Sequence, residues 1–184
     1  EAAVKGGGSM VQLREKESST REFVERAIRL KEVLTPYGVP LIINDRVDVA
    51  LAADADGVHV GQSDMPYEMV KRLLPEGKII GLSVESPEQV LEANDYDLDY
   101  VAASPVFSTT TKTNTIVEWG LDGLRWIRSV SRHPLVAIGG IHSNNVASIF
   151  KAGADSVAVI SAIVSADDPE RAARELLEKS GEPH

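Results

Sequence analysis

The sequence contains no cysteine, which excludes disulfide bonds and thiolate metal sites and suits a reducing cytoplasm. It has no apolar run near the ~20 residues that a membrane-spanning helix needs. Positive charge is also scarce, because 19 Lys and Arg residues stand against 28 Asp and Glu residues, for a net charge of −9. General nucleic-acid binding normally needs a basic face. The composition therefore argues against nucleic-acid and membrane partners and is compatible with a cytoplasmic protein.

Several catalytic signatures are absent as well. The chain has neither a Gly-x-Gly-x-x-Gly fingerprint nor a Walker phosphate-binding loop. It has no cysteine nucleophile and no Ser-His-Asp arrangement. These gaps favour chemistry in which a metal ion and cationic side chains stabilise a leaving group.

What the sequence does contain is an alternation of short apolar runs with longer helical patterns. Nearly continuous β-branched runs, typical of parallel strands buried on both faces, predict strands over residues 10–13, 39–43, 57–60, 78–82, 99–102, 134–138 and 155–159. Amphipathic patterns predict helices over residues 20–34 (with Thr20 as N-cap), 66–74, 87–93, 121–130, 144–152 and 169–177. This alternation predicts a parallel α/β fold.

The positions of the polar residues favour a TIM (β/α)8 barrel over an open doubly wound sheet. Ligand-like residues follow nearly every strand, as expected where all strand ends meet at one mouth. An open sheet would concentrate them at one switch point. We expect one TIM-barrel domain over residues 1–184. Because only seven strands are predicted, we also expect a first strand and most of a helix, roughly 20–30 residues, to precede this sequence.

Charged residues follow the first three predicted strands. The segment Val11-Gln12-Leu13-Arg14-Glu15-Lys16 ends in two cations, and Arg and Lys both bind phosphate. Asp45 and Asp64 follow the next two strands, and carboxylates are preferred ligands of Mg²⁺. A solvated turn, a turn aspartate and a helix N-cap are the respective structural alternatives. The convergence of the three segments favours a metal that bridges to phosphate.

The later loops predict a second anion site. Gly139-Gly140 and Ile160-Ser161 follow the last two strands, where barrel folds often bind phosphate. Glycine lets backbone N–H groups approach an anion, although tight packing would also explain the pair. Ser83 follows the fourth strand, and Thr109-Thr110-Thr111-Lys112 lies in a hydroxyl-rich loop after the fifth. That loop is either a phosphate ligand or an ordinary polar loop.

These segments together resemble the thiamin phosphate synthase family. The resemblance extends, in the family's order, over residues 11–16, 44–50, 57–66, 80–83, 105–107 with 109–112, 137–141 and 159–163, and so covers nearly the whole chain. It implies a Mg²⁺-dependent transferase of thiamine biosynthesis. Such an enzyme joins hydroxymethylpyrimidine pyrophosphate to thiazole phosphate, and releases pyrophosphate after the C–O bond breaks to give a pyrimidine cation.

The resemblance also implies roles for individual residues. Asp45 and Asp64 would hold Mg²⁺, and Arg14, Ser83 and Lys112 would be catalytic. The substrate-binding set would comprise Gln12, Leu13, Arg14, Glu15, Lys16, Asn44, Ser83, Thr109, Thr110, Thr111, Lys112, Gly140, Ile160 and Ser161. Ser104 and Ser108 depart from the Gly and Pro usual in the family, but neither change removes a proposed ligand.

Two other functions remain open at this stage. A thiazole tautomerase-like paralogue would share the barrel and the thiazole phosphate site, but it would not need the paired aspartates. A non-catalytic ligand sensor of the thiamin pathway would not need to retain the whole clamp. The sequence also leaves open whether the protein forms a homo-oligomer.

Overall fold

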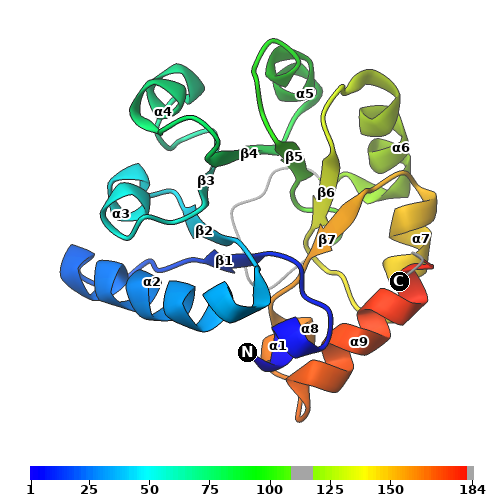
Figure 1. The fold of residues 1–184 in the computed structure, drawn as a ribbon. Coiled ribbons are helices and arrows are strands. Elements are labelled where there is room, and N and C mark those ends of the chain that lie inside the picture. The colour runs from blue at the N-terminus through cyan, green and yellow to red at the C-terminus, as the bar shows by residue number, and fades with distance from the viewer. Residues whose placement is uncertain (109–117, 182–184) are drawn as a thin grey trace. The chain divides into compact units, whose positions relative to one another are not determined.

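Strands and helices alternate along the chain in the computed structural model, which describes residues 1–108 and 118–181 (Figure 1). The chain forms two compact units. The first unit comprises Glu1 and Gly8–Leu82, and the second comprises Ala2–Gly7 and Ser83–His184.

The first unit is a parallel βα arrangement in which consecutive strands are neighbours. Its strands are β1 (Val11–Leu13), β2 (Leu41–Asn44), β3 (Gly57–Val60) and residues 79–82 of β4 (Ile79–Val84). The ladder pairs Leu13 with Ile43, Asn44 with His59, and Val60 with Leu82. The connections are α2 (Thr20–Leu34) with the 3₁₀ turn η1 (Thr35–Tyr37), then α3 (Val47–Ala52), then α4 (Tyr67–Leu73). The carboxyl ends of all these strands therefore lie at one edge of the sheet.

The second unit continues the same pattern. After the end of β4 come β5 (Tyr100–Ala103), β6 (Leu135–Ile138) and β7 (Ser156–Ala158), and these three strands are parallel in chain order. The helices are α1 (Ala2–Lys5), α5 (Pro87–Ala93), α6 (Gly120–Val130), α7 (Val146–Lys151), α8 (Ser161–Val164) and α9 (Pro169–Ser180). Neither unit shows the reversal of strand order that marks a doubly wound sheet.

The core of each unit is made from the apolar strand runs seen in the sequence. Every residue of β2, β3 and β5 is buried, as expected for strands covered on both faces. In contrast, β1 and β7 are partly exposed. Helices add Phe23, Ala27 and Leu34 of α2 to the first core, and Leu124 and Ile127 of α6 to the second.

The predicted elements agree closely with this structure, with two corrections. The described residues contain seven strands at the predicted places, and the first of them begins at Val11. Helix α3 is not predicted, because its six-residue Val-Asp-Val-Ala-Leu-Ala run is short and has no side-chain cap. The prediction that Thr20 caps α2 is wrong: Ser19 is the N-cap and forms a capping box with Glu22. No helix in the described parts of the chain is long and apolar enough to span a membrane.

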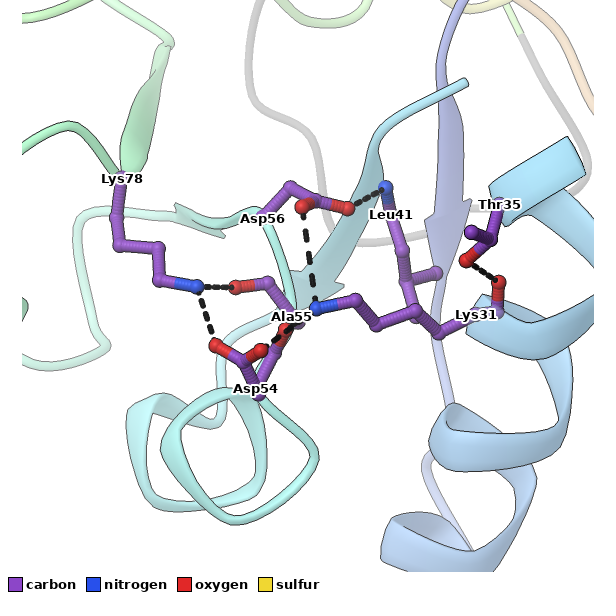
Figure 2. Close-up of polar contacts among 7 residues, drawn as sticks. All are labelled: Lys31, Thr35, Leu41, Asp54, Ala55, Asp56 and Lys78. Carbon is purple, nitrogen blue, oxygen red and sulfur yellow. Dashed lines mark hydrogen bonds and ion pairs between the residues drawn. The ribbon is translucent and has the colours of Figure 1, made fainter. Parts of the chain in front are cut away.

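An ionic network ties the amino-terminal ends of the first unit's strands together (Figure 2). Lys78, which directly precedes β4, donates to Asp54 Oδ1 at 2.6 Å and to the Ala55 carbonyl at 2.7 Å. Lys31 of α2 reaches the same aspartate, at 3.0 Å from its Oδ2. Asp56 accepts a hydrogen bond from the Leu41 amide at 2.8 Å. The network thus joins α2, the α3–β3 connection and β4 at the end opposite to the residues predicted to bind ligand.

Candidate functional site

The first group of predicted ligand residues lies at the carboxyl ends of β1, β2 and β3. Arg14 follows Leu13, whose ladder partner Ile43 precedes Asn44, the last residue of β2. Asn44 is itself buried, and Gln12, Arg14 and Lys16 are exposed. The parallel register therefore places the segment after β1 beside the end of β2.

Asp45 is held in an unusual backbone conformation at this edge. Its φ angle of 65° lies in the left-handed region, which aspartate tolerates better than most residues. Its backbone amide donates to the His59 carbonyl at 2.8 Å, so the strained residue is fixed against β3. Its carboxylate accepts a hydrogen bond from Lys16 Nζ at 2.5 Å. Strain of this kind is often found at functional sites.

Asp64 is fixed by the turn that follows β3. Its carboxylate Oδ2 accepts a hydrogen bond from the Gly61 amide at 2.8 Å, and its own amide donates to the Gly61 carbonyl at 3.2 Å. A Cβ at Gly61 would lie 3.2 Å from the same Oδ2, so glycine gives the carboxylate room. This geometry does not make Asp64 the N-cap of α4, because Pro66 occupies that position without a side-chain hydrogen bond.

The charged cluster of Arg14, Lys16, Asp45 and Asp64 is electrostatically coupled. Burial raises the pKa of Asp64, and the hydrogen-bonded, negatively charged Asp45 raises it further against the opposing Gly61 amide. Burial also raises the pKa of Asp45, but Lys16, Asp64 and Arg14 outweigh it and hold this pKa below its usual range. The structure thus brings the two carboxylates into hydrogen-bonding contact, with Asp64 the one that retains a proton more readily.

The carboxylate pair fits a Mg²⁺ ion. Mg²⁺ is usually bound through one or two carboxylates, several waters and substrate phosphates, not by a cage of protein ligands. Asp45 and Asp64 supply such a pair beside two cations that could hold phosphate. Among the described residues no group of three or more His, Cys, Asp or Glu side chains is placed to hold a metal. Two carboxylates beside two cations match the way in which Mg²⁺ is usually bound.

Two charged neighbours of the cluster have other partners. Arg46 binds Asp48 through its Nε at 2.8 Å and its Nη2 at 2.6 Å, and it reaches Thr20 Oγ1 at 3.0 Å. Glu15 lies between the two cations in sequence, yet its carboxylate is 2.7 Å from Arg26 Nη1 of α2. Arg46 and Glu15 therefore pair outside the cluster, Arg46 with Asp48 of α3 and Glu15 with Arg26 of α2.

The second group of predicted ligand residues lies in the second unit, after β6 and β7. The ladder pairs Ile138 with Ala158, so the segments that begin at Gly139 and at residue 159 leave neighbouring strands at the same edge. Gly139 and Gly140 have φ angles of 102° and 66°, which side-chain-bearing residues rarely adopt. Ile160 is 55% exposed, and Ser161 begins the four-residue helix α8.

Close packing of the glycine turn is a second reason for its residue types. A Cβ on Gly139 would lie 2.8 Å from Pro105 Cβ, and one on Gly140 would lie 2.7 Å from Phe107 Cβ. The Phe107 amide donates to the Gly139 carbonyl at 3.2 Å. The structure therefore shows tight packing, the first of the two explanations offered by the sequence, and anion binding by this turn stays a prediction.

The remaining predicted residues have different outcomes. Ser83 is buried in β4 of the second unit. Thr109, Thr110, Thr111 and Lys112 lie outside the described residues. The positions that flank them are described: Ser108 donates to the Glu118 carboxylate, and the Trp119 amide donates to the Pro105 carbonyl at 3.0 Å.

Sequence reasoning missed the side chains that support both groups. Asn145 donates to the Gly140 carbonyl at 2.8 Å and accepts from the His142 amide at 2.9 Å, so it braces the glycine turn. Arg26 and Ser18 hold Glu15 in the first unit. The signal that could have pointed to Arg26 was the Ser-x-x-Glu capping box at Ser19. This box marks where α2 begins, and the start of the helix determines which of its residues face the loop after β1.

Comparison with known proteins places this chain among enzymes of one pathway. The family model described as thiamine monophosphate synthase matches residues 1–163. A thiamine-phosphate synthase of Albidiferax ferrireducens is 54% identical over 168 residues, which are 91% of this chain and 77% of the relative. A thiamine-phosphate synthase of Vibrio parahaemolyticus is 51% identical over 175 residues, which are 95% of this chain and 86% of the relative.

A solved structure agrees with the sequence matches. The thiamine phosphate pyrophosphorylase from Pyrococcus furiosus aligns with a TM-score of 0.89 and 42% sequence identity. The alignment covers 97% of this chain and 85% of that one. The predicted fold class, the TIM-type (β/α) barrel, is confirmed by this match together with the parallel strands in chain order.

Proposed function

Because the chain belongs to the thiamine monophosphate synthase family, we propose that it couples hydroxymethylpyrimidine pyrophosphate with thiazole phosphate to give thiamin phosphate and pyrophosphate. The structural observation that best supports this reaction is the charged cluster of Arg14, Lys16, Asp45 and Asp64. Such a cluster suits a reaction in which a pyrophosphate group departs. The tautomerase alternative needs no pyrophosphate clamp.

The clamp residues act on the leaving group. As the C–O bond of the pyrimidine substrate lengthens, negative charge grows on the pyrophosphate oxygens. Arg14 and Lys16 offer fixed positive charge there, and they stabilise the departing group more than the bound substrate. Gln12 and Asn44, on the same strand ends, supply neutral amide donors. Ser83 and Lys112 are assigned to the same substrate by family resemblance.

The carboxylate pair would hold the metal. When bound, Mg²⁺ supplies Lewis-acid stabilisation of phosphate oxygens. Asp45 and Asp64 would be its ligands, and both would bind it as carboxylates, because metal ligands must be deprotonated. The left-handed backbone at Asp45 and the Gly61 hydrogen bond to Asp64 hold both carboxylates in place beforehand.

The second substrate is assigned to the second unit. The backbone of Gly139 and Gly140 and the segment that begins at Ile160 follow neighbouring strands, and such turns offer N–H groups to a phosphate. Ser161 adds a hydroxyl, and Thr109 to Thr111 are assigned to the same phosphate by resemblance. The thiazole nitrogen then captures the pyrimidine cation, so no protein nucleophile is required.

A coupling assay tests the proposal. Purified protein is incubated with both substrates and Mg²⁺, and thiamin phosphate and pyrophosphate are measured in parallel. We expect equimolar formation of both products, and no product when either substrate or Mg²⁺ is left out. Folded protein that releases no pyrophosphate would overturn the proposal.

The same assay distinguishes the two alternative functions. A tautomerase would change the thiazole phosphate isomer without consuming the pyrimidine substrate. A ligand sensor would bind one or both compounds, measured by calorimetry, and leave both unchanged. A cytoplasmic location stays a prediction from the sequence, which cell fractionation tests, and light scattering would decide whether the protein forms a homo-oligomer.

A further inference from the structure

The six residues between β1 and α2 are held by a closed group of hydrogen bonds that none of the proposed ligand roles uses. Glu15 Oε1 lies 2.7 Å from Arg26 Nη1, and its Oε2 accepts a hydrogen bond from Ser18 Oγ at 2.8 Å. Arg26 Nη1 also donates to Ser18 Oγ at 3.0 Å. Each member therefore contacts the other two, and the carboxylate of Glu15 has both oxygens occupied.

Glu15, Ser18 and Arg26 form a triad, and the start of α2 fixes the position of Arg26 in it. Ser19 and Glu22 form a reciprocal capping box, which defines where the helix begins. Arg26 lies one turn beyond Glu22, on a helix whose Phe23 and Ala27 are fully packed in the core. Arg26 thus approaches the loop from a rigid element, while the loop itself contributes only Glu15 and Ser18.

The triad separates charges of opposite sign within a single segment. Lys16 forms an ion pair with Asp45, and the charge of Arg14 also acts on Asp45. Glu15, between these two cations, is turned to Arg26 instead. Arg26 compensates a negative charge that would otherwise lie beside the proposed pyrophosphate site.

We infer that Arg26 is a positioning residue for the pyrophosphate clamp: through Glu15 and Ser18 it orients residues 14–16 and keeps the Glu15 carboxylate away from the bound anion. This inference rests on the proposed function, because it assumes that Arg14 and Lys16 bind pyrophosphate. It assigns Glu15 a role inside the protein, in place of the substrate contact expected from the sequence. It also explains why an acidic residue lies between two proposed anion ligands.

Removal of Arg26 should therefore do more harm than removal of Glu15. In Arg26→Gln the carboxylate loses its compensating charge and becomes available to pair with Arg14 or Lys16. In Glu15→Gln the loop loses one ion pair, but no negative charge is released. If the freed carboxylate is the cause, Glu15→Gln should suppress the defect of Arg26→Gln in the double variant. A role confined to loop stability would give a double variant at least as impaired as Arg26→Gln.

The test measures KM for the pyrimidine pyrophosphate, kcat, and the inhibition constant of inorganic pyrophosphate for wild type, both single variants and the double variant. Because the pair is partly exposed, we expect modest changes: KM and the inhibition constant rise about fivefold in Arg26→Gln and about twofold in Glu15→Gln and the double variant. We expect kcat at saturation to change less than twofold. Arg29→Gln, an exposed arginine on the same helix, is the matched control.

The outcomes separate this inference from the proposed function. A folded wild-type protein without coupling activity would overturn the proposed function, and direct binding of inorganic pyrophosphate by calorimetry would still test Arg26. An active wild type whose Arg26→Gln variant matches Arg29→Gln would overturn the inference alone. Failure of the double variant to recover would also overturn the charge-separation role.

Discussion

The two units of the chain prepare for an anion in different ways. In the first, the proposed ligands are long charged side chains at the ends of β1 to β3, and they are held by ion pairs and hydrogen bonds. In the second, the proposed ligand is a glycine turn after β6, shaped by positive φ angles and contact with Phe107. A side-chain site can fail without loss of the fold. A backbone site is part of the packing, so its failure should also lower stability.

The largest expected effect breaks the side-chain site alone. Asp64→Ala removes a proposed metal ligand, and it also removes half of a carboxylate pair whose joint ionisation is unfavourable. We expect kcat/KM to fall at least about 100-fold, the scale of losing one strong electrostatic contact, while the free energy of unfolding changes by less than about 1 kcal/mol. Steady-state kinetics and urea unfolding measure the two quantities.

The control for this comparison is Asp122→Ala, an aspartate of α6 whose side chain is 99% exposed. We expect it to leave both quantities close to wild type. If Asp64→Ala lost melting temperature in proportion to activity, Asp64 would be a structural residue. The contrast between the two sites would then disappear.

The next effect breaks the backbone site. Gly140→Ala forces a side chain onto a backbone with φ of 66° and brings its Cβ within 2.7 Å of Phe107 Cβ. We expect a loss of about 2–4 kcal/mol in the free energy of unfolding, from the conformational strain together with the steric conflict. The KM for thiazole phosphate should rise in the same variant. Thermal unfolding and substrate titration measure both effects.

Gly38→Ala is the matched control for the conformational part of that loss. Gly38 has φ of 64°, and its added Cβ would meet nothing within 4 Å. We expect about 1–2 kcal/mol, the conformational cost alone. Equal losses at the two positions would show that packing against Phe107 contributes nothing to the turn.

The smallest expected effect concerns the ionic network at the opposite ends of the first unit's strands (Figure 2). Hydrogen bonds from Lys78 and Lys31, with their charges, lower the pKa of Asp54 from 3.8 to about 2. The folded state thus binds this proton less readily than the unfolded state. The stabilisation is fully present above about pH 4 and is lost as the pH falls towards 2.

Asp54→Asn should remove this pH-dependent contribution and leave kcat unchanged. Asparagine also tolerates the φ of 47° at this position, so the backbone is not further strained. The difference in unfolding free energy between wild type and variant, measured by urea titration from pH 2 to 6, should shrink as the pH falls. Lys78→Gln should remove most of the same contribution. A difference that does not vary with pH would contradict the role of these ion pairs.

The sequence predicted the strands well because each is a short, nearly continuous apolar run between polar segments. All seven lie within two residues of their predicted bounds, and α2 and α5 coincide with theirs. Helix α3 was not predicted because its six residues, five of them apolar, have no side-chain cap and are too few to show a helical periodicity. Ser and Thr are both good N-caps, so residue type alone could not show that Ser19, and not Thr20, caps α2. Only the observed bond from the Glu22 amide to Ser19 separates them.

The sequence by itself determined the residue types of the proposed sites and their position after the strands, since parallel strands bring their carboxyl ends to one edge. Only the tertiary structure decided which charges face one another. Lys16 pairs with Asp45 across 29 positions of sequence, and Glu15 turns away to Arg26. Such choices depend on the direction of a side chain and the rotation of a helix, and these are set by packing between elements. The same packing requires glycine at position 140 for two reasons: its φ angle is positive, and an added Cβ would collide with Phe107.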